Sequence, residues 1–255
     1  CLRLEHHMNE RVVLVTGALA GIGRATATAF ARDGAAVVVS GRRDEDGKAF
    51  AAELRALGAQ AEYLRADVSI EDDVQALVDG TVKTFGKLDV AVNNAGFTGH
   101  PGQLATQTLE AYNAVFGTNV RGLFFSLKHE LRVMTRQGAG SIVNLSSTFG
   151  ERGGAGAALY SASKHAVNGF TRSAALEVAA TGIRVNAVAP GPVATGGLEH
   201  FAGSQERAAA MAATVPAGRL GSVDDIADVI TFLASDAARF VTGQIVAVNG
   251  GKTAA

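Results

Sequence analysis

The sequence predicts a doubly wound α/β fold, in which a mostly parallel sheet of seven strands is covered by helices on both faces. Short β-branched apolar runs alternate with helix-compatible segments along most of the 255 residues, which is the pattern expected of a parallel sheet. The runs at 12–15 (Val-Val-Leu-Val) and 37–39 (Val-Val-Val) are apolar without interruption, as in strands buried on both faces. A glycine-rich turn directly follows the first run.

Seven apolar runs have the length and the β-branched composition of strands. In chain order they cover residues 11–15, 36–40, 62–65, 88–92, 141–145, 184–189 and 245–248. The last but one runs into Pro190, which cannot donate to a central sheet ladder and so ends a strand.

The segments between these runs have helical character. They cover residues 22–32, 45–57, 69–85, 109–137, 159–180 and 223–234. Glycine, which favours the end of a helix, follows three of them as Gly34, Gly58 and Gly182. Ser69 with Asp72 three residues later matches a capping box, so we expect the third helix to begin there.

The pattern occurs once along the chain, without a low-complexity linker, so we expect a single domain at 8–255. Residues 1–7 (C-L-R-L-E-H-H) lack the apolar segment of a targeting signal and read as an expression scar, with Met8 as the native start. The one long irregular stretch, 190–217, contains a predicted substrate lid at 192–217.

Composition excludes several function classes. The net charge is −1, which provides no electrostatic footprint for nucleic acid or an anionic membrane. No apolar run approaches the roughly 18 residues of a membrane-spanning helix. The only cysteine is Cys1, which fits a reducing compartment and predicts a cytoplasmic protein. The histidines show no metal-ligand spacing, so we expect no metal.

The turn after the first strand has the composition of a nucleotide-binding loop. It reads Thr-Gly-Ala-Leu-Ala-Gly-Ile-Gly at 16–23. Glycines permit a tight turn and let a pyrophosphate approach bare backbone, while the following helix offers free N–H groups. A simple glycine turn is the alternative interpretation, and the position directly after the first strand favours the nucleotide.

Four further motifs occur in order along the chain. Asn-Asn-Ala-Gly at 93–96 follows the fourth strand, and Asn119 lies in the long helix. Ser147 follows the fifth strand, Tyr160 comes thirteen residues later, and Lys164 four residues after that; Pro190-Gly191 ends the sixth strand. With the turn G-x-x-x-G-x-G, this set resembles the short-chain dehydrogenase/reductase family over residues 11–251. The resemblance implies a Rossmann-type, dinucleotide-binding and catalytic domain.

The resemblance implies an NAD(P)-dependent oxidoreductase that interconverts a secondary alcohol and a ketone or 3-oxo group, with Asn119, Ser147, Tyr160 and Lys164 as the catalytic set. Tyr160 and Lys164 share one helix face, and we expect the ammonium, with the positive nicotinamide, to lower the pKa of the phenol. Ser147 can hydrogen-bond the substrate oxygen. By resemblance, Lys164 also binds the ribose, and Asn119 binds a water that links Lys164 to solvent.

A protein of this fold can also bind dinucleotide without turnover, as a sensor or scaffold. Such proteins tend to lose the catalytic set, and all four residues are present here, so the enzyme is the preferred interpretation. Asn93 and Asn119 each have a structural alternative, in which the side chain only satisfies buried backbone or packs.

The resemblance also implies a set of cofactor contacts. They are Gly17, Gly21, Ile22, Gly23, Arg42, Arg43, Asp67, Val68, Asn94, Ala95, Gly96, Tyr160, Lys164, Pro190, Gly191, Val193 and Thr195. Asp67 has an alternative as a turn residue that bonds local backbone.

The end of the second strand bears on the choice of nicotinamide. Enzymes of this architecture that take NAD usually place an acid there, but the position falls at Gly41, and Arg42 and Arg43 follow. A guanidinium forms charge-assisted bonds to a 2′-phosphate, so we expect NADP(H) to be preferred. If Arg42 instead stacks on the adenine and Arg43 is solvated, NAD(H) remains possible.

The substrate itself stays open, as does the direction of the reaction. Residues that directly follow the motifs are candidates for the pocket wall, and two apolar residues of the lid join them. They are Phe97, Thr98, Thr148, Phe149, Phe201 and Met211. The resemblance, the apolar strand at 245–248 and the alanine-rich helix at 159–180 predict a homotetramer with two-fold axes.

Overall fold

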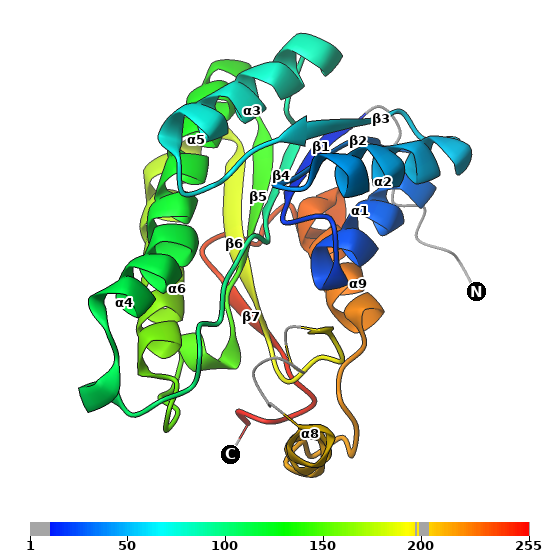
Figure 1. Cartoon of the computed structure of the whole chain (residues 1–255). Coiled ribbons are helices and arrows are strands. Elements are labelled where there is room, and N and C mark those ends of the chain that lie inside the picture. The colour runs from blue at the N-terminus through cyan, green and yellow to red at the C-terminus, as the bar shows by residue number, and fades with distance from the viewer. Residues whose placement is uncertain (1–10, 197, 199–203, 255) are drawn as a thin grey trace.

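In a computed structural model, which describes residues 11–196, 198 and 204–254, the chain forms a seven-stranded sheet with helices on both faces (Figure 1). The strand order is β3-β2-β1-β4-β5-β6-β7, and every pairing is parallel. The strands are β1 (Val12–Thr16), β2 (Ala36–Gly41), β3 (Ala61–Arg65), β4 (Val90–Asn93), β5 (Gly140–Leu145), β6 (Ile183–Pro190) and β7 (Ile245–Val248). The order reverses between β1 and β4, and in such sheets the ligand crevice lies there, outside the carboxyl ends of the strands.

Two apolar layers cover the sheet. Alternate residues of β1 point to opposite faces, so Val13 and Val15 belong to one core while Leu14 belongs to the other. The first layer contains α1 (Gly21–Arg32), α2 (Asp44–Ala56) and α9 (Val223–Ala234). The second contains α3 (Glu71–Phe85), α5 (Gly122–Gln137) and α6 (Ala158–Val178). Figure 1 shows the two groups on opposite sides of the sheet.

Two details of the helices differ from the sequence prediction. The long helical region is α4 (Leu109–Phe116) followed by a π-helical turn (Gly117–Arg121) that leads into α5. The stretch expected to be irregular contains α8 (Gln205–Ala213). Residues 1–7 and Phe201 lie outside the described residues.

The predicted capping box at Ser69 and Asp72 is wrong. Ile70 is the N-cap of α3, and the Ser69 hydroxyl donates instead to Asp67 over 2.7 Å. The local Asx-type turn therefore competes successfully for the serine. A complete capping box is present at α9, where Ser222 and Asp225 bond each other's backbone.

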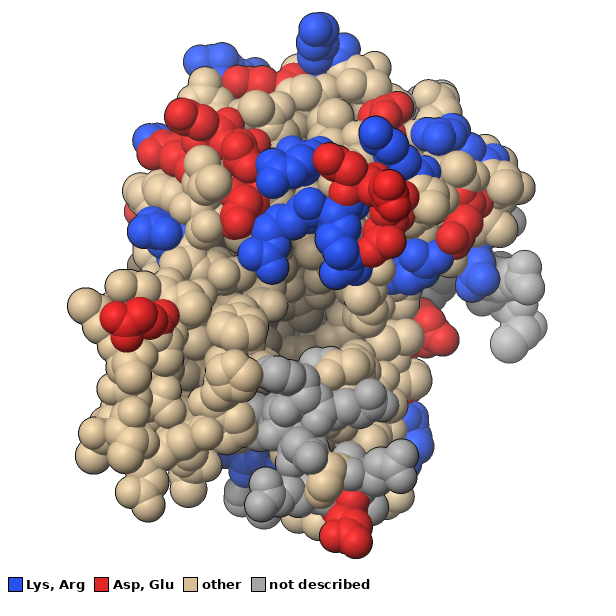
Figure 2. Space-filling view, in the orientation of Figure 1, with Lys and Arg blue, Asp and Glu red and all other residues tan. Residues whose placement is uncertain are grey.

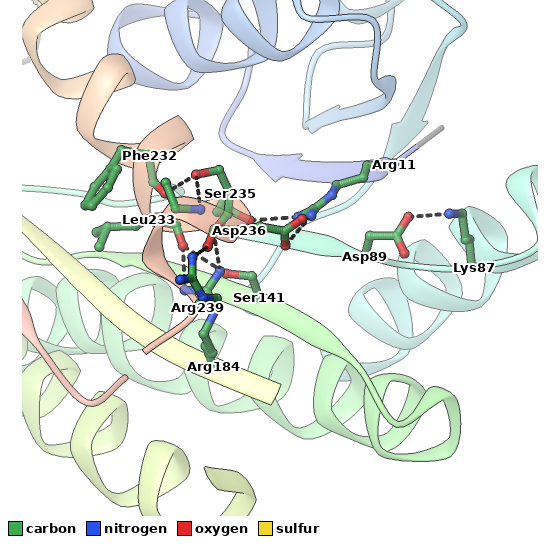
Figure 3. A network of polar contacts seen from close by, with 12 residues as sticks. Arg11, Lys87, Asp89, Ser141, Arg184, Phe232, Leu233, Ser235, Asp236 and Arg239 are labelled. Carbon is green, nitrogen blue, oxygen red and sulfur yellow. Dashed lines mark hydrogen bonds and ion pairs between the residues drawn. The ribbon is translucent and has the colours of Figure 1, made fainter. Parts of the chain in front are cut away.

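Arginine side chains near the amino ends of the strands hydrogen-bond the C-terminal end of α9 (Figure 3). Arg184, at the start of β6, donates to the carbonyl oxygens of Leu233 over 2.6 Å and Ser235 over 3.1 Å. Arg11 donates to the carbonyl of Ala234 over 3.0 Å and pairs with Asp236. These bonds satisfy carbonyl groups that a helix end leaves free. They lie at the end of the sheet opposite the carboxyl ends of the strands. Among the helices that the structure describes, none combines the length and the apolarity needed to cross a membrane.

Candidate active site

A cavity of about 550 Å³ opens at the carboxyl ends of β4, β5 and β6. Figure 2 shows a hollow in the middle of this face, with Lys and Arg side chains along its upper rim, interspersed with Asp and Glu. The predicted residues that line the cavity are Ile22, Asn94, Gly96, Phe97, Thr98, Ser147, Thr148, Phe149, Tyr160, Lys164, Pro190, Gly191, Val193, Thr195 and Met211. Residues that are far apart in the sequence thus meet at one end of the sheet.

Ser147 and Tyr160 face each other in this cavity. Ser147 is the N-cap of the short 3-10 helix Thr148–Gly150. The hydroxyl accepts from the Phe149 N–H over 3.2 Å, and it lowers the pKa of the Tyr160 phenol against the larger effect of burial. The neighbouring Ser146 instead donates to Asn168 Oδ1 over 2.5 Å. The two serines therefore have different partners, and of the two only Ser147 affects the pKa of Tyr160.

Lys164 lies one helical turn after Tyr160, but its ammonium does not meet the phenol oxygen. Nζ lies 5.7 Å from the centre of the Tyr160 ring and donates to the carbonyl of Leu145 over 2.6 Å. Burial lowers the pKa of Lys164 to about 8. Burial also raises the pKa of Tyr160 to about 12, an effect that the Ser147 hydroxyl only partly opposes.

The expected lowering of the tyrosine pKa by the ammonium is therefore wrong for the protein by itself. The phenol is partly withdrawn from water, which disfavours the phenolate. The charge of Lys164 is directed to a backbone carbonyl rather than to the phenol oxygen. In this environment the phenol of Tyr160 is neutral at pH 7.

Asn119 lies in the π-helical turn, and its side chain is fully bonded. Oδ1 accepts from the backbone N–H of Phe97 over 2.8 Å, while Nδ2 donates to the Phe97 carbonyl over 2.8 Å and to Ser163 Oγ over 3.0 Å. The amide fixes the segment after β4 against α6. Asn119 and Lys164 also line a cavity of about 10 Å³, which is about the space of one water molecule.

The glycine-rich turn fits a pyrophosphate. Gly17 has φ +62°, and a Cβ there would lie 2.8 Å from Ala95 Cα, so only glycine permits this approach of β1 to β4. The Asn94 amide fastens the turn by donating to the carbonyls of Thr16 and Gly17. A Cβ at Gly23 would lie 2.4 Å from that amide. Ala20, the N-cap of α1, offers no side-chain cap, so the first N–H groups of the helix are available to an anion.

A second cavity, of about 380 Å³, lies beside the first and shares Gly96 with it. The predicted residues that line it are Gly17, Arg42, Arg43, Asp67, Val68, Ala95 and Gly96. At its rim Arg42 Nη1 lies 3.7 Å from Asp67 Oδ2, and Arg43 pairs with Asp46. The other carboxylate oxygen of Asp67 accepts from Ser69, so the local-turn interpretation of Asp67 holds for that oxygen.

Gly41 ends β2 at the wall of this second cavity. A Cβ at Gly41 would lie 2.7 Å from Leu19 Cδ1. The leucine side chain therefore covers the position where an acidic residue would otherwise project toward a ribose.

Some predicted residues lie beside these cavities rather than in their walls, and the sequence reasoning missed others. Gly21 and Gly23 shape the turn without lining either cavity. The missed lining residues include Arg152, Leu198 and Lys252. For Arg152, the sequence offers one signal that it could line the cavity: it follows Phe149 in a glycine-containing loop. In the described part of the chain, no three His, Cys, Asp or Glu side chains come together as metal ligands.

Known proteins share this arrangement over nearly the whole chain. A family model described as enoyl-(acyl carrier protein) reductase matches residues 17–253. Cis-4-hydroxycyclohexanecarboxylate dehydrogenase of Sinomonas cyclohexanicum is 46% identical over 245 residues, which are 96% of this chain and 97% of that protein.

Two solved structures extend the comparison. The crystal structure of levodione reductase superposes with a TM-score of 0.94 at 36% identity, covering 97% of this chain and 99% of that chain. The structure of ElxO with NADP bound superposes with a TM-score of 0.91 at 34% identity, covering 96% and 99%. The fold, the ordered motifs and these matches agree, and the chain belongs to the short-chain dehydrogenase/reductase family of NAD(P)-dependent oxidoreductases.

Proposed function

We propose that this protein interconverts a secondary alcohol and a ketone, with Tyr160 as the general acid and base. The observation that carries the proposal is that Ser147 and Tyr160 both line the wall of one large cavity, with Lys164 beside them. A carbonyl oxygen bound between these two hydroxyls would receive two donors where negative charge develops, and the phenol would deliver the proton. No observation favours a binding protein without turnover.

The nicotinamide, when bound, supplies or accepts the hydride at the substrate carbon. For reduction, Tyr160 donates its proton to the carbonyl oxygen while Ser147 fixes that oxygen. For oxidation, the phenol must first lose its proton, and the positive nicotinamide would oppose the effect of burial on the pKa of Tyr160. The residues that would hold the nicotinamide in the large cavity are Gly96, Pro190, Gly191, Val193 and Thr195, all of which line it.

We assign Lys164 and Asn119 to cofactor binding and proton transfer. Lys164 is buried beside Tyr160 and borders both the large cavity and the 10 Å³ cavity. A water molecule in the small cavity would lie between the ammonium and the π-helical turn of Asn119. Because burial holds the pKa of Lys164 to about 8, this amine can exchange a proton near neutral pH.

We propose that NADP(H) is preferred over NAD(H). Arg42 and Arg43 both line the second cavity, where they can bind a 2′-phosphate, and Gly41 provides no carboxylate to repel it. Asp67 and Val68 would border the adenine. The neighbouring structure of ElxO contains NADP, which is consistent with this assignment.

Several further assignments belong to the proposal. The segment 8–255 would be one domain with a lid at 192–217, in the cytoplasm, without nucleic-acid or membrane partners. A homotetramer is supported by outward apolar side chains, among them Leu176 on α6, which is 82% exposed, and Phe240 before β7, which is 100% exposed. Light scattering of the full chain at micromolar concentration tests this assembly, and a monomer mass would exclude it.

The activity is tested by incubating the full chain and NADPH with a panel of cyclic and linear ketones. Turnover follows from the loss of NADPH absorbance, and the alcohol is identified by chromatography. The relative named above suggests alicyclic alcohols as the first substrates to include. Binding of NADPH without turnover of any ketone, together with no oxidation of the matching alcohols, would contradict the enzyme and favour the sensor.

A further inference from the structure

The charged side chains that line the large cavity are all cations. They are Arg152, Lys164 and Lys252, and no Asp or Glu occurs among the described lining residues. Lys164 lies at the reacting end and directs its ammonium to the Leu145 carbonyl. The other two have no role in the hydride transfer proposed above.

Arg152 and Lys252 reach the cavity from two segments that are about a hundred residues apart in the sequence. Arg152 follows the short 3-10 helix that carries Ser147, while Lys252 follows β7. Both side chains line the same cavity, so two positive charges act on one space. Burial and the positive charge of Arg152 both lower the pKa of Lys252.

Neither group forms an ion pair with a carboxylate of the described residues. Lys252 donates to the hydroxyl of Thr214, which occupies one of the three N–H donors of an ammonium. The segment around Lys252 is also fixed to the end of the lid, because Ala217 N–H donates to the Gly250 carbonyl over 3.0 Å. Figure 1 shows α8 and the C-terminal segment next to each other.

Two like charges at one cavity disfavour the free protein and favour a bound anion. Part of the cavity wall is apolar: Phe149 lines it, and its ring lies edge-on to Tyr160 at 6.1 Å between centroids. A Cβ at Gly154 would lie 2.2 Å from that ring, so glycine is required for Phe149 to occupy this place. The cavity thus combines two hydroxyls, an apolar wall and a pair of cations.

We propose that the physiological substrate is a small hydroxy or oxo acid built on one six-membered ring. Its carboxylate binds Arg152 and Lys252, while its carbonyl or hydroxyl group binds Ser147 and Tyr160. A carboxylate matches the planar donor fork of a guanidinium, and the apolar wall suits one ring between the two polar ends. This assignment rests on the proposed alcohol–ketone chemistry. In reduction the carbonyl carbon gains a hydride from the nicotinamide and its oxygen gains the Tyr160 proton; the carboxylate is unchanged.

The test compares two ketones of similar shape, 4-oxocyclohexanecarboxylate and the neutral 4-methylcyclohexanone. We expect the wild type to have a kcat/KM at least about tenfold higher for the carboxylate, in keeping with a charge-assisted hydrogen bond. Arg152→Gln and Lys252→Gln should each lower kcat/KM for the carboxylate roughly ten- to hundredfold, mainly through KM. Both variants should leave the neutral ketone within about threefold of the wild type.

Arg136→Gln is the matched control, because Arg136 is exposed near the end of α5, away from the lining residues of the cavity. This substitution also removes one positive charge, and it should leave kcat/KM for both ketones unchanged. Equal kcat/KM for the two ketones in the wild type, or equal losses for both in the variants, would refute the carboxylate site while leaving the proposed oxidoreductase intact.

The proposed function can fail independently. If neither ketone is turned over, titration calorimetry with cyclohexanecarboxylate on the full chain still decides the anion site. Binding to the wild type that Arg152→Gln and Lys252→Gln abolish would support it, and absent binding would overturn it. Inorganic phosphate that competes more strongly than cyclohexanecarboxylate would also overturn it, because the site would then be one for phosphorylated compounds.

Discussion

The ammonium of Lys164 lies over the ring of Tyr160, 5.7 Å from its centre, and donates its hydrogen bond to the carbonyl of Leu145. The Ser147 hydroxyl, by contrast, lowers the pKa of the Tyr160 phenol. The lysine and the serine therefore act on the tyrosine in different ways. This division separates the effects of the three side chains in mutagenesis.

Tyr160→Phe should lower kcat at least about a hundredfold, because it removes the proton donor while leaving the ring that packs against Phe149. The Kd for NADPH, measured by fluorescence titration, should stay within about threefold of the wild type, because a phenol contributes only one hydrogen bond. A variant that keeps more than about a tenth of the wild-type kcat would remove Tyr160 from the acid/base role.

Ser147→Ala and Ser146→Ala form a matched pair of adjacent substitutions. Ser147→Ala should lower kcat about a hundredfold or more, as with the loss of one oxyanion donor. It should also move the alkaline rise of alcohol oxidation to higher pH, because the Ser147 hydroxyl opposes the raised pKa of Tyr160. Ser146→Ala should retain activity and lose about 1 kcal/mol of stability, since its hydroxyl bonds only Asn168 among the described residues. The reverse ranking in kcat would exclude Ser147.

Arg42→Ala and Arg43→Ala test the cofactor preference. Each substitution should lower kcat/KM for NADPH about tenfold or more, because a charge-assisted bond to the 2′-phosphate is lost. The kcat/KM for NADH should change by less than about threefold. Arg65→Ala is the control, because Arg65 pairs with Asp73 over 3.6 Å and does not line the second cavity. A wild type that prefers NADH tenfold would show that these arginines do not bind the phosphate.

Glu130 predicts a pH dependence of stability. It is buried on α5, accepts from Asn93 Nδ2 over 2.9 Å, and burial raises its pKa from 4.5 to about 7. The folded state therefore binds the proton more tightly than the unfolded state. This contribution is complete below about pH 4.5 and is lost as the pH rises through about 7.

Glu130→Gln imitates the protonated form, so the variant should gain stability relative to the wild type between about pH 5 and pH 8. The limit is about 3 kcal/mol, as an order of magnitude. Urea unfolding of both proteins across this range provides the measurement, and Glu177→Gln, an exposed position on α6, is the control. A stability difference that stays constant with pH would show that Glu130 is ionised throughout.

The elements of the sheet could be predicted because their signal is local. In β1 the four residues before Thr16 are all apolar, since both faces of the strand are buried, and the motif residues directly follow such strands. The predicted capping box at Ser69 is wrong for a local reason too: the Ser69 hydroxyl donates to the carboxylate of Asp67, two residues earlier. No local sequence pattern predicts the π-helical turn at Gly117–Arg121. Its Asn119 side chain bonds Phe97 and Ser163, which are distant in the sequence.

The walls of the active-site cavity were only partly predictable. Phe97 and Phe149 were found because they follow recognisable motifs. Arg152 and Lys252 belong to segments about a hundred residues apart in the sequence, and only the closure of the sheet brings them to one cavity. Their proximity is a tertiary property, and so is the direction of the Lys164 ammonium, which the helical spacing from Tyr160 leaves undetermined.

The contact between Leu19 and Gly41 makes position 19 a partner in any change at position 41. A Cβ at position 41 would lie 2.7 Å from Leu19 Cδ1, so an aspartate there requires the leucine side chain to shift. The shift costs little, because the contacting atoms belong to the end of a flexible side chain that is only partly buried. A carboxylate at position 41 would therefore be accommodated by a new rotamer of Leu19, with the backbone of the glycine-rich turn unchanged.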